Sequence, residues 1–214
     1  MTILLAALAG YAIGSVPTAV WLGRLWGVDL LRDGSGNPGA NNARRLGGHT
    51  PAILILIIEV AKGLTAVVVG LAIGGEAAIM GGEAAILGGE AAGLAAGLGA
   101  VAGNVFNVWH QFKGGKGLGI SGGVVLGLWP AAFPFIVLTL VFACVLTRST
   151  GIGTLVTLGV VLVGAFAWES TGLENPWGLA DPVLLVLLVI GIGLIIGPRH
   201  WRDARNRLRS PVRP

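Results

Sequence analysis

The sequence predicts an all-α protein, a polytopic membrane helix bundle with about seven transmembrane helices. Its 214 residues have a mean hydropathy of +0.84, and 54% are hydrophobic while only 11% are charged. A soluble domain carries about 25% charged residues. Several apolar runs approach or exceed the ~20 residues that a helix needs to cross a bilayer. Basic and acidic residues also alternate between successive loops, as expected for a chain that crosses the membrane repeatedly.

Seven apolar segments are expected to span the membrane. They lie at about residues 2–26, 51–73, 86–108, 118–129, 130–147, 152–169 and 181–198. The first has neither a basic n-region nor an early small-residue cleavage site, so we interpret it as a membrane helix rather than a signal peptide.

The middle of the chain allows two interpretations. Residues 118–146 can form one long tilted helix or two short helices broken near Trp129-Pro130. With two helices, the basic residues fall on one side of the membrane and the opposite loops carry only acidic ones. The basic set is Arg24, Arg32, Arg44, Arg45, Lys113, Lys116, Arg148 and the C-terminal tail; the acidic set is Glu76, Glu83, Glu169, Glu174 and Asp181. The positive-inside rule therefore predicts seven spans, an N-terminus outside and a cytoplasmic C-terminus.

We expect one integral-membrane domain, residues 1–198, followed by a basic cytoplasmic tail, residues 199–214. The tail holds Arg199, Arg202, Arg205, Arg207, Arg209 and Arg213. Their position directly after an apolar run is typical of a topology signal or an anionic-lipid anchor, and no aromatic-interleaved basic surface indicates nucleic acid. Cys144 is the only cysteine, which excludes a disulfide framework and a thiolate metal site.

Residues 74–94 contain three copies of Gly-Gly-Glu-Ala-Ala, which place Glu76, Glu83 and Glu90 at seven-residue spacing. A seven-residue step keeps side chains on one face of a helix. We interpret the repeat as an expansion of an outer loop and helix start. A partner or metal surface is the alternative.

Two loops rich in glycine and basic residues fall on the cytoplasmic side of this topology. The first glycine loop runs from Gly34 to Arg45, and the second, which we call the lysine loop, is Phe112-Lys113-Gly114-Gly115-Lys116-Gly117. Glycine lets successive backbone N–H groups face an anion, and lysine or arginine adds charge. Ser35, Asn37, Asn41 and Asn42 add hydroxyl and amide groups, and Arg45 can hold phosphate in a bidentate fork. The two loops together predict a phosphate site at the membrane edge.

Other polar residues within the apolar segments are also candidates. Glu59 and Lys62 are three positions apart, on one face of the second span, so they form either a structural pair or a wall of the polar cavity. Interfacial packing is the default role for His49, His110 and His200, and His110 is the best functional candidate because it precedes the lysine loop.

Several catalytic motifs are missing. No Ser or Thr follows Lys116, so the lysine loop is not a nucleotide-binding P-loop. The His-x4-Asp acyltransferase dyad, the His-Glu-x-x-His zinc motif and the Gly-x-Ser-x-Gly elbow are likewise absent.

The loops and their flanking residues resemble the bacterial acyl-phosphate:glycerol-3-phosphate acyltransferases, the PlsY family. The likeness is carried by Gly14-Ser15-Val16-Pro17-Thr18-Ala19, by Gly34 to Arg45, by Lys62-Gly63 and by Phe112 to Gly117. It covers most of the first 150 residues in order and spacing.

This resemblance implies a seven-helix membrane enzyme that moves a fatty acyl group from acyl phosphate to the 1-hydroxyl of glycerol 3-phosphate, giving lysophosphatidate and phosphate. It implies catalytic roles for Ser35, Arg45 and Lys116. The expected substrate-binding residues are Asn37, Asn42, Lys62, His110, Lys113, Gly114, Gly115, Gly117 and His200. No metal or other cofactor is implied. We expect a monomer in the cell membrane, with its active site facing the cytoplasm.

The chain departs from the family pattern at several positions. Asn104 stands where a histidine is expected, Glu59 where an aspartate is expected, and Ile120 where a threonine is expected. The C-terminal motif is represented only by His200-Trp201-Arg202-Asp203-Ala204. The proton acceptor is left open between the substrate's own phosphate, His110 and Glu59. The alternative function is a catalytically impaired family member or a transporter that binds a phosphorylated lipid or metabolite.

Overall fold

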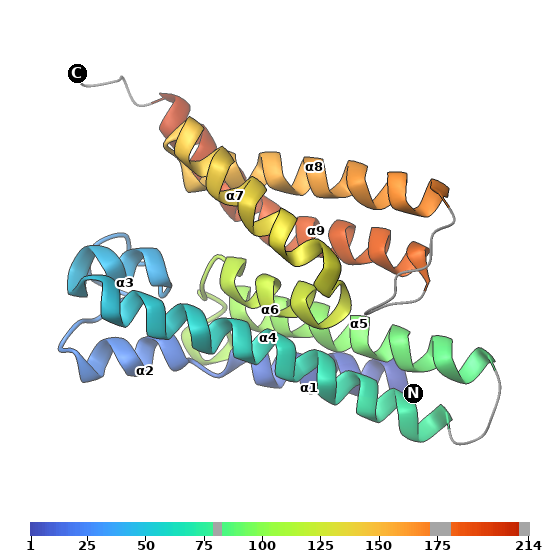
Figure 1. Ribbon diagram of the computed structural model, residues 1–214. Coiled ribbons are helices and arrows are strands. Elements are labelled where there is room, and N and C mark those ends of the chain that lie inside the picture. The colour runs from blue at the N-terminus through green and yellow to red at the C-terminus, as the bar shows by residue number, and fades with distance from the viewer. Residues whose placement is uncertain (79–82, 172–180, 210–214) are drawn as a thin grey trace. The chain divides into compact units, whose positions relative to one another are not determined.

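The structure is a computed structural model that describes residues 1–78, 83–171 and 181–209. All the regular elements in these ranges are helices (Figure 1). The chain forms two compact units, Met1–Leu128 and Trp129–Pro214. The predicted all-helical membrane fold is confirmed.

The first unit contains α1 (Thr2–Ser15), α2 (Thr18–Leu25), α3 (Ala40–Gly47), α4 (His49–Ala78), α5 (Glu83–Val105), the 3-10 turn η1 (Val108–His110) and α6 (Leu118–Leu128). The second contains η2 (Pro130–Ala132), α7 (Phe133–Thr147), α8 (Thr150–Thr171) and α9 (Pro182–Arg209). Six helical stretches of the described residues are long and apolar enough to cross a membrane, and α6 is shorter. The count of seven spans and the orientation of the termini stay predictions.

The predicted break in the middle of the chain is present. Helix α6 ends at Leu128, and α7 does not begin until Phe133. Between them Trp129 has φ −143° and ψ 62°, and Pro130 begins η2. A proline has no N–H to donate to the preceding helical turn and restricts the residue before it to extended conformations, which explains why one continuous helix does not form.

The sequence predicted one continuous helix over residues 2–26, but the structure has two helices there. Helix α1 ends at Ser15 and α2 begins at Thr18, although the stretch Thr2–Leu25 as a whole has the length and hydropathy of a membrane span. Pro17 causes the break, because it cannot donate the hydrogen bond that the carbonyl of Ile13 would receive in a helix. The N–H of Val16 bonds to that carbonyl instead, at 3.3 Å. The interruption lies next to both glycine loops.

The last helix is longer than predicted. It continues through Pro198 to Arg209, so the predicted boundary at residue 198 lies inside a helix. The assignment of residues 199–214 to a cytoplasmic tail stays a prediction. The glycine-glutamate repeat spans the end of α4 and the start of α5; residues 79–82 and the side chains of Glu76 and Glu83 lie outside the described part of the chain.

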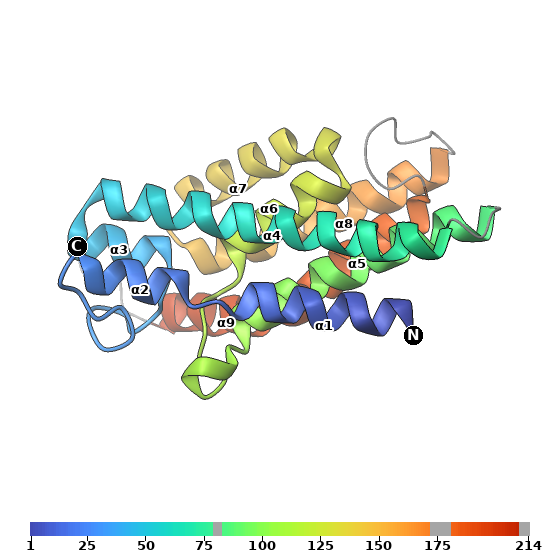
Figure 2. The same ribbon diagram turned by 90° about the horizontal axis from the view of Figure 1, so that it is seen from below.

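Small residues bring the helices of the first unit into backbone contact. Figures 1 and 2 show the arrangement of these helices. Helix α1 packs along α5, and α4 packs along both α5 and α6. A Cβ on Gly10 or Gly14 would overlap a carbonyl oxygen of α5, and one on Gly99 or Gly103 would overlap a carbonyl oxygen of α1. Each pair has the Gly-x-x-x-Gly spacing that allows membrane helices to approach closely. The same close approach occurs between α4 and α6 at Gly63 and Gly123.

Candidate functional site

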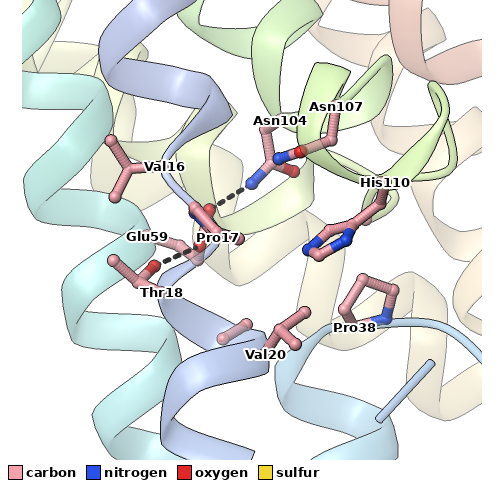
Figure 3. Close-up of a pocket in the computed structure, with 12 residues that line it drawn as sticks. Val16, Pro17, Thr18, Val20, Pro38, Glu59, Asn104, Asn107 and His110 are labelled. Atoms are coloured by element: carbon pink, nitrogen blue, oxygen red, sulfur yellow. Dashed lines mark hydrogen bonds between the residues drawn. The ribbon is translucent and has the colours of Figure 1, made fainter.

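A pocket opens in the first unit at the break between α1 and α2. Four parts of the chain line it: Val16 to Val20 at the break, Pro38 of the first glycine loop, Glu59 of α4, and Asn104, Asn107, His110, Gly114 and Gly115 around the end of α5. In Figure 3 the His110 ring lies across the pocket from Thr18 and Glu59, beside Pro38. The pocket therefore joins apolar helix ends to the two loops selected from the sequence.

The helix break at Pro17 leaves backbone carbonyls without helical donors, and side chains donate hydrogen bonds to them instead. The amide of Asn107 donates to the carbonyl oxygen of Ser15 at 2.7 Å, and the ammonium of Lys62 donates to that of Val16 at 2.8 Å. In a hydrocarbon setting, irregular backbone is tolerated only where the protein itself supplies such partners. Lys62 of α4 and Asn107, which precedes η1, thus hold the wall of the pocket in place.

Glu59 is the centre of this polar network. Its Oε1 accepts hydrogen bonds from Lys62 and Thr18, each at 3.1 Å, and its Oε2 accepts one from Asn104. The Glu59 and Lys62 side chains are only 11% and 10% exposed. The two interpretations left open for this pair both describe part of the structure, because the residues form a buried ion pair and Glu59 also lines the pocket.

Two departures from the family pattern, Asn104 and Glu59, are in direct contact. Figure 3 shows the Asn104 amide directed at the Glu59 carboxylate. In the sequence these two positions are separate departures from the family pattern. The structure shows that they belong to one hydrogen-bonded cluster.

The glycines of the lysine loop pack against the end of α5. The N–H of Gly114 donates to the carbonyl of Val105 at 3.1 Å, and the N–H of Gly115 donates to that of Asn104 at 3.0 Å. A Cβ on Gly114 would overlap the Asn104 carbonyl oxygen. These two amides therefore satisfy carbonyls at a helix terminus, whereas the sequence suggested that they would face an anion.

A tight turn connects the pocket to the lysines. It begins at Asn107, whose side-chain oxygen accepts from the N–H of Trp109 at 3.1 Å. Gln111 and Phe112 both have positive φ, at 54° and 61°. Such conformations cost free energy for residues other than glycine and persist where surrounding contacts hold them. The turn leaves Lys113 exposed and Lys116 half-buried.

The first glycine loop is held by Asn42, which is 2% exposed. Its side-chain oxygen accepts from the N–H of Ser35 at 2.9 Å, and its NH2 group donates to the carbonyls of Leu30 and Asp33 at 3.2 and 3.0 Å. Gly34 and Gly36 supply the positive φ values, 63° and 65°, that the turns need. Asn42 therefore acts on the loop's conformation and presents Ser35 at the surface.

The two glycine loops meet at the edge of the pocket. A Cβ on Gly115 would lie 3.4 Å from the carbonyl oxygen of Pro38, so these backbones are in van der Waals range. Asn37 is the chain neighbour of Pro38 and is half-buried. Loops separated by about 75 residues of sequence are thus adjacent, as the hypothesis of a shared phosphate site requires.

Not every candidate from the sequence lies at the pocket. His110, Gly114 and Gly115 line it, and Lys62 supports its wall. Ser35, Arg45 and Lys113 are exposed on the loops and on α3, and Gly117 has φ 80° just before α6. His200 belongs to the second unit, where it is buried in α9 at 1% exposure.

The sequence did not single out Thr18 or Asn107 as site residues. Both line the pocket and donate hydrogen bonds into the network around the break. Pro17 within an apolar run was the sequence feature that could have indicated them. A proline there leaves nearby backbone carbonyls without their helical N–H donors, so side chains must supply the hydrogen bonds. In the described part of the chain, no three His, Cys, Asp or Glu side chains group as metal ligands would.

Comparison with known proteins gives a consistent result. A family model described as glycerol-3-phosphate acyltransferase matches residues 4–210. A protein of that name from Synechococcus sp. (strain JA-3-3Ab) is 34% identical over 220 residues, covering 97% of this chain and 91% of the relative. Another from Rhodopseudomonas palustris (strain BisB5) is 40% identical over 207 residues, covering 96% of this chain and 91% of the relative.

Solved structures give the same fold. The crystal structure of PlsY, an integral membrane glycerol 3-phosphate acyltransferase, in its glycerol 3-phosphate form is 25% identical with a TM-score of 0.74. The match covers 97% of this chain and 92% of PlsY. The lysophosphatidic acid form superposes with a TM-score of 0.73.

Proposed function

The chain belongs to the glycerol-3-phosphate acyltransferase family, and from that membership we propose that it transfers a fatty acyl group from acyl phosphate to the 1-hydroxyl of glycerol 3-phosphate. The products are lysophosphatidate and inorganic phosphate. Family membership favours this reaction over the non-catalytic or transport alternative. The single structural observation that supports it best is the meeting of the two glycine loops at one pocket, where Gly115 approaches Pro38.

Charge on the two loops suits two anionic substrates. In this proposal Arg45, Lys113 and Lys116 hold the phosphate groups of glycerol 3-phosphate and acyl phosphate, because guanidinium and ammonium groups form strong hydrogen bonds to phosphate oxygens. Ser35 and Asn37 orient the acyl carbonyl or the acceptor hydroxyl. Asn42, Gly114 and Gly115 act indirectly, by fixing the loops that carry these side chains.

Acyl phosphate is an activated donor, so the proposed reaction needs no covalent enzyme intermediate. The protein aligns the hydroxyl with the carbonyl carbon, which in well-oriented systems lowers a barrier by about 7–11 kcal/mol. Cationic donors aimed at the departing phosphate contribute a further ~3 kcal/mol for each well-placed group. Both effects depend on loop geometry rather than on a nucleophilic side chain.

The orientation in the membrane is also part of the proposal. Both glycine loops carry basic residues and fall on the cytoplasmic side under the positive-inside rule. The active site would then open to the cytoplasm, where water-soluble glycerol 3-phosphate is available. We propose further that one chain contains a complete site and functions as a monomer.

The activity is tested with purified protein in lipid nanodiscs supplied with acyl phosphate and glycerol 3-phosphate. Inorganic phosphate and lysophosphatidate should appear in equal amounts, and Lys116→Ala should reduce turnover by at least ~100-fold. Arg32→Ala is the matched control, because Arg32 is an 87% exposed cation of the same unit that pairs with Asp29. The control should retain wild-type turnover.

A different result would distinguish the alternative function. Binding of both substrates without release of phosphate would support a non-catalytic protein. Equal losses in Lys116→Ala and Arg32→Ala would argue that general surface charge, rather than the lysine loop, supports activity.

A further inference from the structure

Asn104 connects a buried side chain of α4 to the lysine loop. It is the second-to-last residue of α5, and it makes two contacts of different kinds. Its side-chain amide donates to Oε2 of Glu59, and its backbone carbonyl accepts from the N–H of Gly115 at 3.0 Å. Gly115 directly precedes Lys116. A continuous path of hydrogen bonds therefore runs from Glu59 to the residue beside a lysine that is proposed to hold phosphate.

The Glu59 end of this path is fixed. Lys62 and Thr18 both donate to its Oε1 at 3.1 Å, and the Lys62 ammonium also donates to the carbonyl of Val16 at 2.8 Å. Figure 3 shows the side chains of Thr18 and Asn104 directed at the Glu59 carboxylate. Hydrogen bonds to an ionised group are strong, and a buried setting strengthens them further. The carboxylate therefore has a defined position relative to α4 and the start of α2.

The other end of the path is a helix terminus, which needs support of this kind. The last carbonyls of an α-helix have no intrahelical N–H donors, and the final turn tends to fray. In α5 the lysine loop supplies two of these donors, because Gly114 bonds to Val105 and Gly115 bonds to Asn104. The position of the loop amides therefore follows the position of the last turn of α5. The Asn104 side chain connects that turn to Glu59.

A shift of this turn would reach the edge of the pocket. Gly114 and Gly115 are buried, so the loop is packed against protein at this point. A Cβ on Gly115 would lie 3.4 Å from the carbonyl oxygen of Pro38 in the first glycine loop. Movement of Gly115 would therefore change the position of Lys116 and the spacing between the two loops together.

We propose that Glu59 is a positioning residue for the acyl transfer, a role that rests on the function proposed above. Through Asn104 it fixes the last turn of α5, and through that turn it sets where Gly115 and Lys116 lie relative to the bound phosphate. Glu59 needs no contact with substrate in this scheme, and it keeps its ion pair with Lys62 throughout the reaction.

The lengths of the two side chains provide the test. Glu59→Asp keeps the negative charge but withdraws the carboxylate by about 1.5 Å, the length of one carbon–carbon bond. Asn104→Gln extends the amide by the same distance, so the double variant Glu59→Asp/Asn104→Gln should restore the contact that either single variant disturbs.

The phosphate-release assay measures the catalytic effect of these variants. Each single variant should lose about 10- to 100-fold in kcat, because a displacement of ~1 Å in a site can cost about 100-fold. The double variant should recover most of that loss, and this non-additivity identifies a direct coupling. A role confined to stability would lower the unfolding midpoint and leave the kcat of the folded protein unchanged.

A second measurement does not depend on activity. Amide hydrogen exchange of the peptide that contains Gly114 and Gly115 reports on the hydrogen bonds from the lysine loop to α5. Exchange should be faster in both single variants and should return to the wild-type rate in the double variant. Glu169→Asp is the matched control, because it shortens an exposed carboxylate near the end of α8, and it should change neither kcat nor exchange.

Asn104→Leu guards against loss of folding in Glu59→Asp. It removes the same hydrogen bond but leaves the pair of Glu59 and Lys62 intact, so it should show the same loss of kcat and the same faster exchange. Wild-type kcat and exchange in folded Glu59→Asp or Asn104→Leu protein would overturn the inference and leave the proposed function intact. Additive losses in the double variant would also overturn it. A wild-type protein that releases no phosphate would reject the proposed function and this role with it, even if exchange still followed the lengths of the two side chains.

Discussion

The side-chain amide of Asn107, which precedes η1, donates a 2.7 Å hydrogen bond to the carbonyl of Ser15, the last residue of α1. Asn107 is 4% exposed and Ser15 is 3% exposed, so water cannot replace this bond. It ties the broken first span to the turn that carries His110. The stability of the pocket can be tested through this contact.

Asn107→Leu should destabilise the protein. The substitution leaves the Ser15 carbonyl buried without this donor, which costs about 1–3 kcal/mol. Thermal unfolding in detergent should show a lower midpoint than wild type. Asn41→Leu, at an exposed position of α3, is the control and should have little effect. Equal midpoints for wild type and Asn107→Leu would mean that the bond does not support the fold.

Removing one member of the buried ion pair should cost more. Lys62→Met leaves Glu59 without its counter-ion and the Val16 carbonyl without the ammonium, and breaking a buried pair costs about 3–5 kcal/mol. The double variant Glu59→Gln/Lys62→Met should be more stable than Lys62→Met alone, because no unpaired charge remains. Unfolding of the two single variants and the double variant measures the coupling. Additive losses would contradict a direct interaction between the two side chains.

Gly114→Ala should impair both folding and turnover. The added Cβ would overlap the Asn104 carbonyl, so the lysine loop must move away from α5. Overpacking of this kind costs about 1–3 kcal/mol, and a displacement of ~1 Å in a site can reduce turnover by about 100-fold.

Gly164→Ala in α8 provides the comparison for that variant. A Cβ at Gly164 meets nothing within 4 Å, so this change should be neutral or should stabilise the helix by up to about 1 kcal/mol. Thermal unfolding and phosphate release measured on both variants complete the test. If Gly114→Ala behaved like Gly164→Ala, the close approach of the loop to α5 would be unimportant.

The predicted orientation can be tested by cysteine labelling, since Cys144 is the only native cysteine. On a Cys144→Ala background, Ser170→Cys should react with a membrane-impermeant maleimide from the outer face of right-side-out vesicles. Arg32→Cys should react only in inverted vesicles, because the positive-inside rule places its loop in the cytoplasm. Both sites are exposed on the protein, so both should react after solubilisation. Labelling of both from the same side would refute the seven-span topology.

The sequence was sufficient to predict the fold class and the adjacency of the glycine loops. Hydropathy and charge bias indicated the membrane helices, and Trp129-Pro130 indicated the break that separates α6 from α7. Periodicity could not predict that α1 would stop at Ser15, because every residue around Pro17 except Ser15 and Thr18 is apolar and the run has the length of a full span.

The hydrogen-bond partners of the polar side chains in the site could not be predicted from the sequence. Asn42 was selected for a substrate, but its amide holds the loop, and Asn107 was not selected although it lines the pocket. Composition identifies a polar side chain, whereas its partner depends on three-dimensional neighbours. Only the structure could show that both Glu59 carboxylate oxygens accept hydrogen bonds while His110 Nε2 is buried without a hydrogen-bond partner in the described residues.

The glycine contacts between α1 and α5 restrict how substrates can enter. Backbone atoms meet at Gly14 and Gly103, within two residues of the helix ends at the pocket, and the Tyr11 hydroxyl donates a hydrogen bond to the Phe106 carbonyl at 2.7 Å. Small residues at such an interface allow close van der Waals packing of the two backbones, which holds the helices together. We therefore expect α1 and α5 to stay together when substrate enters, and any conformational change to occur in the two glycine loops.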